Sequence, residues 1–397
     1  MKILYIHQYF NTPDLGGPTR SYWISKKLKE DGHDVFMLTT VGDKKVPKRE
    51  IYKGINIINI HVPYSSEMGV LRRIKSFIQF MVLSSLHVLG KEKYDLIIAT
   101  STPLTVGVPA LMSKKIKKRP YIFEVRDLWP EAPIQMGILT NKALIAITKW
   151  FEKAIYKNAK HIVALSPGMV KGVLETDVPK EKITMIPNMS KIDIFWPRKK
   201  KLSIIQELKL SPHSFKVVYF GSMGPTNGMD YIIDAAKLIG PEDNIEFLFF
   251  GGGPDENLLK ERCRKEQIKN TRFYDDQPTA KLSEIVNFCD VSLVTFANFP
   301  ILNTNSPNKF FDSLSAGIPI IVNSPGWTKE IVEHHQCGLF SDPLSSKDLA
   351  QKITFLKNNP DTCKKMGENS RKLAETKYDK SILCAQFAQL VKQLSNT

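Results

Sequence analysis

Short apolar runs alternate with amphipathic stretches along the whole chain. In the first half, seven runs rich in β-branched and other apolar residues have the length of buried strands, and helical periodicity fills the intervals. This alternation predicts a parallel sheet covered by helices. The expected strands are residues 2–6, 34–39, 55–60, 96–99, 121–125, 161–165 and 183–186.

The same alternation restarts in the second half. The stretch before it is rich in Lys, Pro and Ser and has weak periodicity, as is typical of a linker. We therefore predict a first domain at 1–195, a linker at 196–214, a second α/β domain at 215–378 and a C-terminal amphipathic helix at 379–397. The expected strands of the second domain are residues 216–220, 245–250, 271–274, 291–296, 319–322 and 338–340.

Residues 71–89, LRRIKSFIQFMVLSSLHVL, form an apolar helical segment with a basic start. The apolar part is too short and too often interrupted by polar residues to span a bilayer, which requires about 20 predominantly apolar residues. Two interpretations remain open. The helix lies in a membrane interface with its basic end on lipid headgroups, or it covers the sheet and exposes only that basic end.

The charge of the chain is uneven. Residues 1–200 contain 33 Lys or Arg and 17 Asp or Glu, a net charge of +16, whereas the remaining residues contain 23 of each. The apolar fraction of 42% and the charged fraction of 24% exclude a disordered, collagenous or polytopic membrane protein. A basic half indicates an anionic partner. The cationic run at 113–119 is by itself most often a solvated helix end. Since the cations are not interleaved with aromatic residues, an anionic membrane is favoured over nucleic acid as the partner.

The cysteines and the N-terminus indicate a cytoplasmic protein. Five cysteines are scattered without metal-binding spacing, as expected of apolar filler in a reducing compartment. The first residues enter a strand directly and show no signal-peptide pattern.

Glycine-rich loops follow the first strand of each domain. Gly16 and Gly17 precede the first helix, and Gly221, Gly224 and Gly228 lie in the corresponding loop of the second domain. Such glycines let a diphosphate approach backbone amides at a helix N-terminus. The loops lack a GxGxxG dinucleotide pattern, and an ordinary turn is the alternative interpretation.

The segment from Asn303 to Ile320 carries the most chemical information. Pro307 and Gly317 are the start and stop signals of a short helix, on which Lys309 and Asp312 share one face. A cation near a helix N-terminus opposes the helix dipole, so a bound phosphate would explain Lys309. Asp312 could accept hydrogen bonds from two ribose hydroxyls. The alternative is a simple Lys–Asp pair within the helix.

The chain resembles the retaining glycosyltransferases of family 4, which have the GT-B fold. Among them, it is similar to bacterial transferases of O-antigen and capsule synthesis, including fucosamine transferases. The resemblance implies two Rossmann-like domains whose parallel sheets face each other across a cleft, with the C-terminal helix returning to the first domain. The motifs that carry it are the glycine loops, Glu124–Glu131, Leu165–Gly168, Ile186–Asn188, Pro307–Asp312 and Ala316–Pro319.

The resemblance also implies roles for individual residues. Asp312 matches the acid that binds the nucleotide ribose, while Thr304 replaces a glutamate that contacts the donor sugar. Ser222 and Asn227 replace the Arg and Lys that neutralise the diphosphate, so Lys309 is the expected substitute, with Arg20 and Arg126 as further candidates. Arg126 replaces the family's histidine, and Asp127, with Glu131 or Glu124, is expected to contact the sugar. The predicted donor-binding residues are Gly16, Gly17, Arg20, Gly221, Ser222, Asn227, Asp276, Thr304, Asn305, Ser306 and Asp312, and the predicted catalytic residues are Asp127, Arg126, Lys309 and Glu131.

The function that this resemblance implies is retaining transfer of an aminosugar from a UDP-sugar. The implied acceptor is a saccharide on an undecaprenyl-diphosphate type of lipid, at the inner face of the cytoplasmic membrane. No cofactor is expected, and no DxD-type carboxylate pair indicates a metal, since Asp275 and Asp276 are interpreted as part of the loop beside the nucleotide base. Two alternatives remain: a sugar-nucleotide epimerase or hydrolase of the same fold, and an inactive membrane-bound scaffold.

Overall fold

The chain divides into two compact units. The computed structural model describes residues 1–15, 17–64 and 68–395. The N-terminal unit is Met1–Pro187 together with the C-terminal residues from Ser381, and the C-terminal unit is Asn188–Lys380. The segment predicted as a linker, 196–214, lies within the C-terminal unit. There it forms α7 (Ser203–Glu207), and its Ile204, Leu208 and Leu210 are buried in a core cluster with Phe195.

The N-terminal unit is built on a sheet with strand order β3-β4-β2-β1-β5-β6-β7-β8 among the described residues. Its pairs are parallel except for β3 with β4. The sequence pattern did not predict β3, because this edge strand is largely exposed and has no buried face to leave a hydrophobic signal. The strands are β1 (Lys2–Ile6), β2 (Asp34–Val41), β3 (Arg49–Tyr52), β4 (Ile55–His61), β5 (Leu96–Thr100), β6 (Tyr121–Val125), β7 (His161–Ala164) and β8 (Ile183–Met185).

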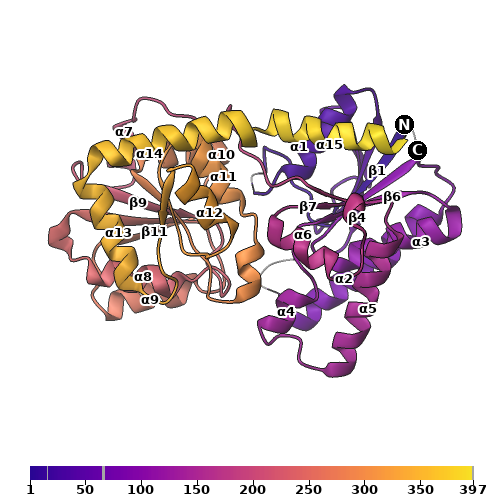
Figure 1. Cartoon of the computed structure of the whole chain (residues 1–397), viewed down its shortest axis with the longest axis horizontal. Helices are drawn as coiled ribbons and strands as arrows, with labels where there is room; N and C mark the ends of the chain where they lie inside the picture. Colours follow the sequence, from indigo (N-terminus) through magenta and orange to yellow (C-terminus); the bar gives the residue numbers. More distant parts are fainter. Residues whose placement is uncertain (16, 65–67, 396–397) are drawn as a thin grey trace. The chain divides into compact units, whose positions relative to one another are not determined.

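Helices cover this sheet in the manner expected of an α/β unit (Figure 1). They are α1 (Arg20–Glu30), α2 (Val70–Leu89), α3 (Gly107–Lys117), α4 (Glu131–Gln135), α5 (Lys142–Asn158), α6 (Pro167–Leu174) and α15 (Lys380–Ser395), with 3₁₀ turns η1 (Leu104–Val106) and η2 (Lys180–Lys182). Among the described residues, no helix has both the length and the apolar character needed to cross a membrane.

The C-terminal unit has a parallel sheet of order β11-β10-β9-β12-β13-β14. All six of the strands predicted here form, with ends shifted by at most two residues. They are β9 (Phe215–Phe220), β10 (Ile245–Phe250), β11 (Thr271–Tyr274), β12 (Val291–Val294), β13 (Ile320–Val322) and β14 (Gly338–Phe340).

Alternate residues of the central strands enter two cores, one on each face of this sheet. Val217 and Tyr219 pack with α8, α9 and α13, whereas Val218 and Phe220 pack with α7, α10 and α11. Strands buried on both faces read as continuous apolar runs, which is why the sequence located them so well. The helices are α8 (Met229–Leu238), α9 (Glu256–Lys265), α10 (Thr279–Phe288), α11 (Asn308–Ala316), α12 (Trp327–His334), α13 (Ser346–Asn358) and α14 (Pro360–Leu373), with short turns η3 (Pro241–Asp243), η4 (Pro300–Thr304) and η5 (Ala374–Tyr378).

Each sheet reverses its strand order at one point. In the N-terminal unit the reversal lies between β1 and β5, and in the C-terminal unit between β9 and β12. Ligands of doubly wound sheets bind outside the carboxyl ends of the strands at such a reversal. We therefore expect ligand-binding residues directly after β1, β5 and β6 in the N-terminal unit. In the C-terminal unit we expect them directly after β9, β10 and β12.

Candidate active site

Two glycines form the rim of the C-terminal sheet where β9 and β10 end. Gly221 has φ +123° and Gly251 has φ +127°, conformations that favour glycine. A Cβ at Gly251 would lie 2.3 Å from the carbonyl oxygen of Gly221, so the two backbones can approach only without side chains. The loop after β9 thus offers bare backbone, as predicted for a phosphate-binding loop.

Lys309 of α11 points at this loop. Its Nζ lies 3.8 Å from the centroid of the Tyr219 ring and 3.4 Å from where a Cβ of Gly221 would be. Among the described residues this buried ammonium has no hydrogen-bond partner. Burial lowers the pKa of Lys309 from 10.5 to about 7. A buried cation without a counter-ion beside bare backbone is suited to an anionic ligand.

Lys309 is held in place by the helix that carries it. The hydroxyl of Ser313 donates to Ser292 Oγ at 2.7 Å, which fixes α11 against β12. The helix ends as predicted, with Gly317 in the left-handed conformation at φ +69°. The position of Lys309 therefore follows from local packing and capping signals.

Asp312 lies one turn further along α11 and is buried. Its partner is Lys191, whose Nζ lies 3.1 Å from Asp312 Oδ1, rather than Lys309 of its own helix. Burial raises the pKa of Asp312, and Lys191 opposes that rise. The structure thus supplies Asp312 with a counter-ion from a segment distant in sequence, and this arrangement keeps a carboxylate available as a hydrogen-bond acceptor.

Three predicted donor-binding residues line the glycine loops. Ser222 is exposed, and its carbonyl accepts a hydrogen bond from the Tyr219 hydroxyl at 2.6 Å. The carbonyl of Asn227 accepts a hydrogen bond from Thr295 Oγ1 at 2.8 Å, and its side-chain Nδ2 donates to Thr226 Oγ1 at 3.4 Å. Asp276 is exposed, with Oδ1 3.4 Å from where a Cβ of Gly251 would be.

The segment before α11 is held mainly through its backbone. Thr304 ends the η4 turn, and its hydroxyl donates to the Ile301 carbonyl at 2.7 Å. The carbonyl of Asn305 accepts from Trp327 Nε1 at 2.7 Å. Ser306 is buried, and its Oγ accepts from the backbone N–H of Asn188 at 3.1 Å. These contacts fix the backbone that leads into Lys309.

A second polar cluster lies at the carboxyl edge of the N-terminal sheet. Arg126 follows β6 and donates through Nη1 to Nε2 of His7, which follows β1, at 3.1 Å. Burial and the neighbouring Arg126 hold the pKa of His7 well below its usual value, so the ring is neutral. Because Nε2 accepts from Arg126, the proton is on Nδ1, which donates to Ser21 Oγ at 2.7 Å.

Asp127 lies beside this pair. Its Oδ2 accepts a hydrogen bond from Thr102 Oγ1 at 2.6 Å. Burial raises the pKa of Asp127, and the Thr102 hydrogen bond together with Arg126 opposes the rise. The N-terminal cluster therefore combines a neutral imidazole, a guanidinium and a carboxylate, which can bind several hydroxyls of a sugar.

Arg20 and Glu124 form a buried ion pair, with Nε 2.7 Å from Glu124 Oε1. The other guanidinium nitrogens donate to the carbonyls of Ile186 and Pro187. Tyr5 and Thr100 also donate to this carboxylate. This geometry is typical of a structural ion pair, since the donors of Arg20 are directed at protein atoms.

The remaining predicted residues of the N-terminal unit are less enclosed. Glu131 begins α4 and pairs with Lys149 at 3.4 Å, with both side chains partly exposed. Gly17 has φ +72°, and a Cβ there would lie 3.1 Å from Asn11 Nδ2, so this turn favours glycine. Gly16 lies outside the described residues.

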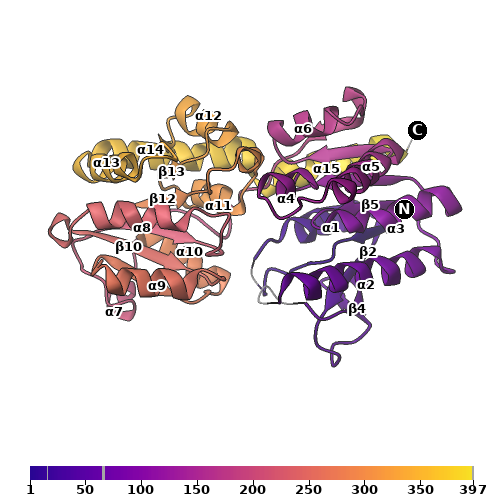
Figure 2. The ribbon, with the colours of Figure 1, turned by 90° about the horizontal axis from the view of Figure 1, so that it is seen from below.

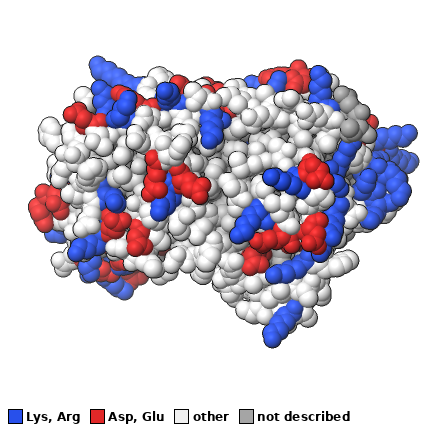
Figure 3. All heavy atoms as spheres, viewed as in Figure 1, with Lys and Arg blue, Asp and Glu red and all other residues white. Residues whose placement is uncertain are grey.

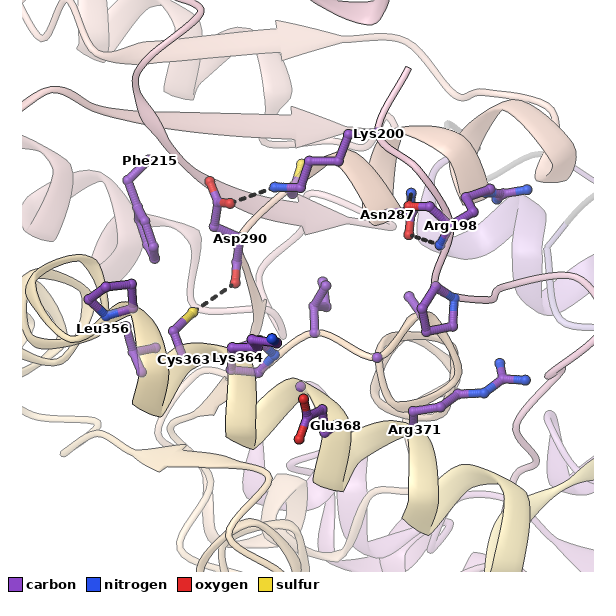
Figure 4. A pocket seen from close by; sticks show the side chains of 18 of the residues that line it. Arg198, Lys200, Phe215, Asn287, Asp290, Leu356, Cys363, Lys364, Glu368 and Arg371 are labelled. Atoms are coloured by element: carbon purple, nitrogen blue, oxygen red, sulfur yellow. Dashed lines mark hydrogen bonds and ion pairs between the residues drawn. The ribbon is translucent and has the colours of Figure 1, made fainter. Parts of the chain in front are cut away.

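A pocket of about 640 Å³ lies at the opposite edge of the C-terminal sheet. Its lining includes Phe215 at the start of β9 and Asp290 just before β12, so it is at the amino ends of the strands. Figure 4 shows Asp290 paired with Lys200, at 2.7 Å, and in contact with Cys363. This pocket lies away from Lys309 and the glycine loops and is a separate feature.

His7 and Lys191 were not predicted from the sequence. His7 directly follows the first strand, and its position at the carboxyl end of a strand could have identified it as a candidate site residue. Lys191 follows the Ile186–Asn188 motif, and nothing in its local pattern indicates a partner in α11. No group of three or more residues able to hold a metal ion occurs in the described part of the chain.

Two protein families match the sequence, one over each half of the chain. The family described as "Glycosyl transferase 4-like domain" matches residues 16–189, and "Glycosyl transferases group 1" matches residues 200–373. The chain belongs to the family 4 type of GT-B glycosyltransferases. A glycosyltransferase family thus matches the sequence of each unit, and the predicted fold class is confirmed.

Individual relatives of this glycosyltransferase are distant. It is 22% identical over 60% of the chain to the alpha-galactosylglucosyldiacylglycerol synthase of Streptococcus pneumoniae, and that match spans 63% of the relative. It is 23% identical over 91% of the chain to the capsular polysaccharide biosynthesis glycosyltransferase CapM of Staphylococcus aureus, covering 90% of the relative. The crystal structure of Anabaena HepE in complex with UDP and glucose aligns with a TM-score of 0.74 and 17% identity, covering 99% of each chain.

Proposed function

We propose that this glycosyltransferase moves an N-acetylated aminosugar from a UDP-sugar to a lipid-diphosphate-linked saccharide during surface polysaccharide synthesis. The observation that carries the donor part is the buried, unpartnered ammonium of Lys309 at the bare Gly221 backbone. Asp312, one turn along the same helix, supplies an acceptor for the ribose hydroxyls. The UDP and glucose named for the Anabaena HepE structure are consistent with this type of donor.

The reaction breaks the bond between the anomeric carbon and the diphosphate oxygen. As this bond breaks, the diphosphate gains negative charge and the sugar gains oxocarbenium character. The Lys309 ammonium and the amides of the glycine loop stabilise the departing charge without a metal ion. The acceptor hydroxyl oxygen bonds to the anomeric carbon on the face that the diphosphate leaves, so configuration is retained, and its proton passes to the leaving phosphate oxygen.

The N-terminal cluster is proposed to bind the transferred sugar or the acceptor. Arg126 and Asp127 offer donors and acceptors at one strand edge, and neutral His7 fixes the Arg126 guanidinium. A carboxylate and a guanidinium bind vicinal hydroxyls well, because both form pairs of hydrogen bonds. In this proposal Asp127 acts in its ionised form. Glu131, which is paired with Lys149 nearer the surface, has a secondary role.

The lipid-linked acceptor and the membrane location rest on charge and on relatives. The excess of 16 positive charges lies in residues 1–200, and residues 1–187 of that stretch form most of the N-terminal unit. One relative is named for synthesis of a glycosylated diacylglycerol and another for capsular polysaccharide. A basic unit that meets an anionic membrane fits both.

A product screen tests the proposal. Purified protein is incubated with a lipid-diphosphate saccharide and a panel of nucleotide sugars, and transfer is followed by mass spectrometry. Transfer from a UDP-aminosugar, with release of UDP in the presence of a chelator, is expected. Conversion of the donor without an acceptor would instead indicate an epimerase or hydrolase.

A substitution tests the assignment of the leaving-group cation. Lys309→Ala is expected to lower kcat by at least 100-fold, because one preorganised charge at a leaving group is worth about 3–4 kcal/mol. Lys329→Ala is the matched control, since Lys329 also lies over an aromatic ring, that of Phe340 at 4.2 Å. Full activity of Lys309→Ala would show that the diphosphate binds elsewhere.

A further inference from the structure

Helix α2 exposes apolar side chains to solvent. Leu71, Ile74, Ile78, Val82 and Leu86 follow one another at spacings of three or four residues and so form one stripe along the helix. Their side chains are between 44% and 83% exposed. Figure 2 shows α2 running along the outside of the N-terminal unit. A stripe of this length on a soluble domain is unusual and marks an interaction surface.

The inward face of α2 carries both apolar residues, Phe80 and Val88, and small polar ones. Ser76, Ser84 and Ser85 are buried. The hydroxyls of Ser84 and Ser85 donate to the helix's own carbonyls at Phe80 and Met81, at 2.6 and 2.7 Å. Helix α2 packs on α3. The outer stripe lies on the exposed side of the helix, away from this buried face, so burial in the core does not explain it.

Cations surround this stripe. The first two turns of α2 contain Arg72, Arg73 and Lys75, and the adjacent α3 ends in a lysine-rich run around the exposed Ile116. Within the described residues none of these cations lies within ion-pair distance of a carboxylate, and neither helix contains Asp or Glu. Figure 3 shows Lys and Arg gathered at the right-hand edge, where Figure 1 places α3.

Helix α5 extends the same surface, since α3 contacts both α2 and α5. Leu144, Ile147 and Trp150 lie on the first turns of α5 and are 50–70% exposed. Lys142 and Lys149 lie on the same part of this helix. Tryptophan beside lysine is typical of side chains that sit at a bilayer interface.

We infer that the outer faces of α2 and α5, with the basic end of α3, dock on an anionic lipid bilayer. The inference rests on the proposed function, since it specifies how a lipid-linked acceptor is reached. Apolar side chains enter the acyl boundary while the surrounding cations meet anionic headgroups. A second copy of this chain is a poorer occupant, because a two-fold contact would place these unpaired cations against one another.

Vesicle binding tests the inference. The full chain is mixed with sucrose-loaded vesicles of phosphatidylcholine with 30% phosphatidylglycerol, or of phosphatidylcholine alone, and sedimented. Wild type is expected to bind the anionic vesicles at least tenfold more tightly, with binding that weakens as salt rises. The double variant Ile78→Ser/Val82→Ser is expected to lose at least tenfold in partitioning. Both positions are exposed, so folding is preserved, as thermal unfolding would verify.

The matched control is Leu258→Ser, an exposed leucine on α9 of the C-terminal unit, which should bind like wild type. Wild-type binding by the double variant, or equal binding to both vesicle types, would overturn the inference. So would a wild-type dimer in sedimentation velocity that the double variant abolishes, because that result would assign the face to a second copy. A UDP-induced thermal shift in the same proteins reports separately on the donor site, so failure of the proposed function is distinguishable from failure of membrane docking.

Discussion

Lys191 Nζ lies 3.1 Å from Asp312 Oδ1, and both side chains are only 9% exposed. The contact joins the first residues of the C-terminal unit to α11, the helix that carries Lys309. Ser190 Oγ strengthens the same junction by donating to the Phe311 carbonyl at 2.9 Å. The ion pair therefore connects the stability of this unit to the orientation of the carboxylate proposed to bind ribose.

Removing either partner leaves a buried charge without its counter-ion. We expect Lys191→Met and Asp312→Asn each to lower the free energy of unfolding by about 3 kcal/mol, because breaking a buried pair costs more than replacing it. The double variant should lose clearly less free energy of unfolding than the sum of the two single losses. Urea unfolding of all four proteins measures this coupling energy. Additive losses would show that the two residues act independently.

Lys191→Met should also weaken UDP binding, although Lys191 is not proposed to touch UDP. Without the ammonium, the pKa of Asp312 rises further, since Lys191 is what opposes the effect of burial. A protonated carboxyl is a poorer acceptor for ribose hydroxyls. The weakening should therefore be larger at pH 6 than at pH 8, as measured by calorimetric titration. A pH-independent loss would indicate general distortion of α11 instead.

Local signals in the sequence were enough to predict part of this site. Pro307 and Gly317 delimit α11, and the spacing of Lys309 and Asp312 places both on one face, as the structure shows. The sequence could not show that Asp312 pairs with Lys191, because that contact depends on how distant segments pack. The same holds for α2: periodicity predicted the helix, but its composition left open which face would point outward.

The buried ammonium of Lys309 should make stability depend on pH. The folded-state pKa of about 7 lies below the value of 10.5 expected for an unfolded lysine. Between these values the unfolded chain binds more protons, so stability should rise with pH across this window. Relative to Lys309→Met, wild type should gain about 2 kcal/mol between pH 7 and pH 9.

Urea unfolding at the two pH values, without nucleotide, measures this difference. Lys329→Met serves as the control, because no comparable gain is expected from a partly exposed lysine. Parallel pH profiles for wild type and Lys309→Met would mean that the Lys309 ammonium keeps its ordinary pKa in the folded state.

Arg20 was predicted to bind the donor, and its contacts lead to a different expectation. The side chains of Arg20 and Glu124 are 1% and 0% exposed, and the guanidinium donates to Glu124 and to two backbone carbonyls. Arg20→Met should lower the free energy of unfolding by about 3 kcal/mol or more, because it leaves Glu124 buried and unpaired. Arg20→Met/Glu124→Met should recover part of that loss.

The affinity of the folded Arg20→Met protein for UDP separates the two roles. A structural ion pair predicts an affinity close to that of wild type at a temperature where the variant is folded, as checked by circular dichroism. A loss of affinity above tenfold with little change in stability would restore Arg20 as a donor-binding residue.

The hydrogen bond from Thr102 to Asp127 should set the acidic limb of activity. The Thr102 hydroxyl lies 2.6 Å from Asp127 Oδ2 and lowers a pKa that burial raises. Thr102→Val removes the donor at nearly constant volume, so the pKa of Asp127 should rise further. If Asp127 acts as a carboxylate, activity is lost as pH falls through that pKa, and the acidic limb of kcat/KM should move to higher pH by the same amount. Thr102→Ser keeps the hydroxyl and should leave the limb in place. A lower kcat in Thr102→Val with an unmoved limb would mean that the ionisation of Asp127 does not control the reaction.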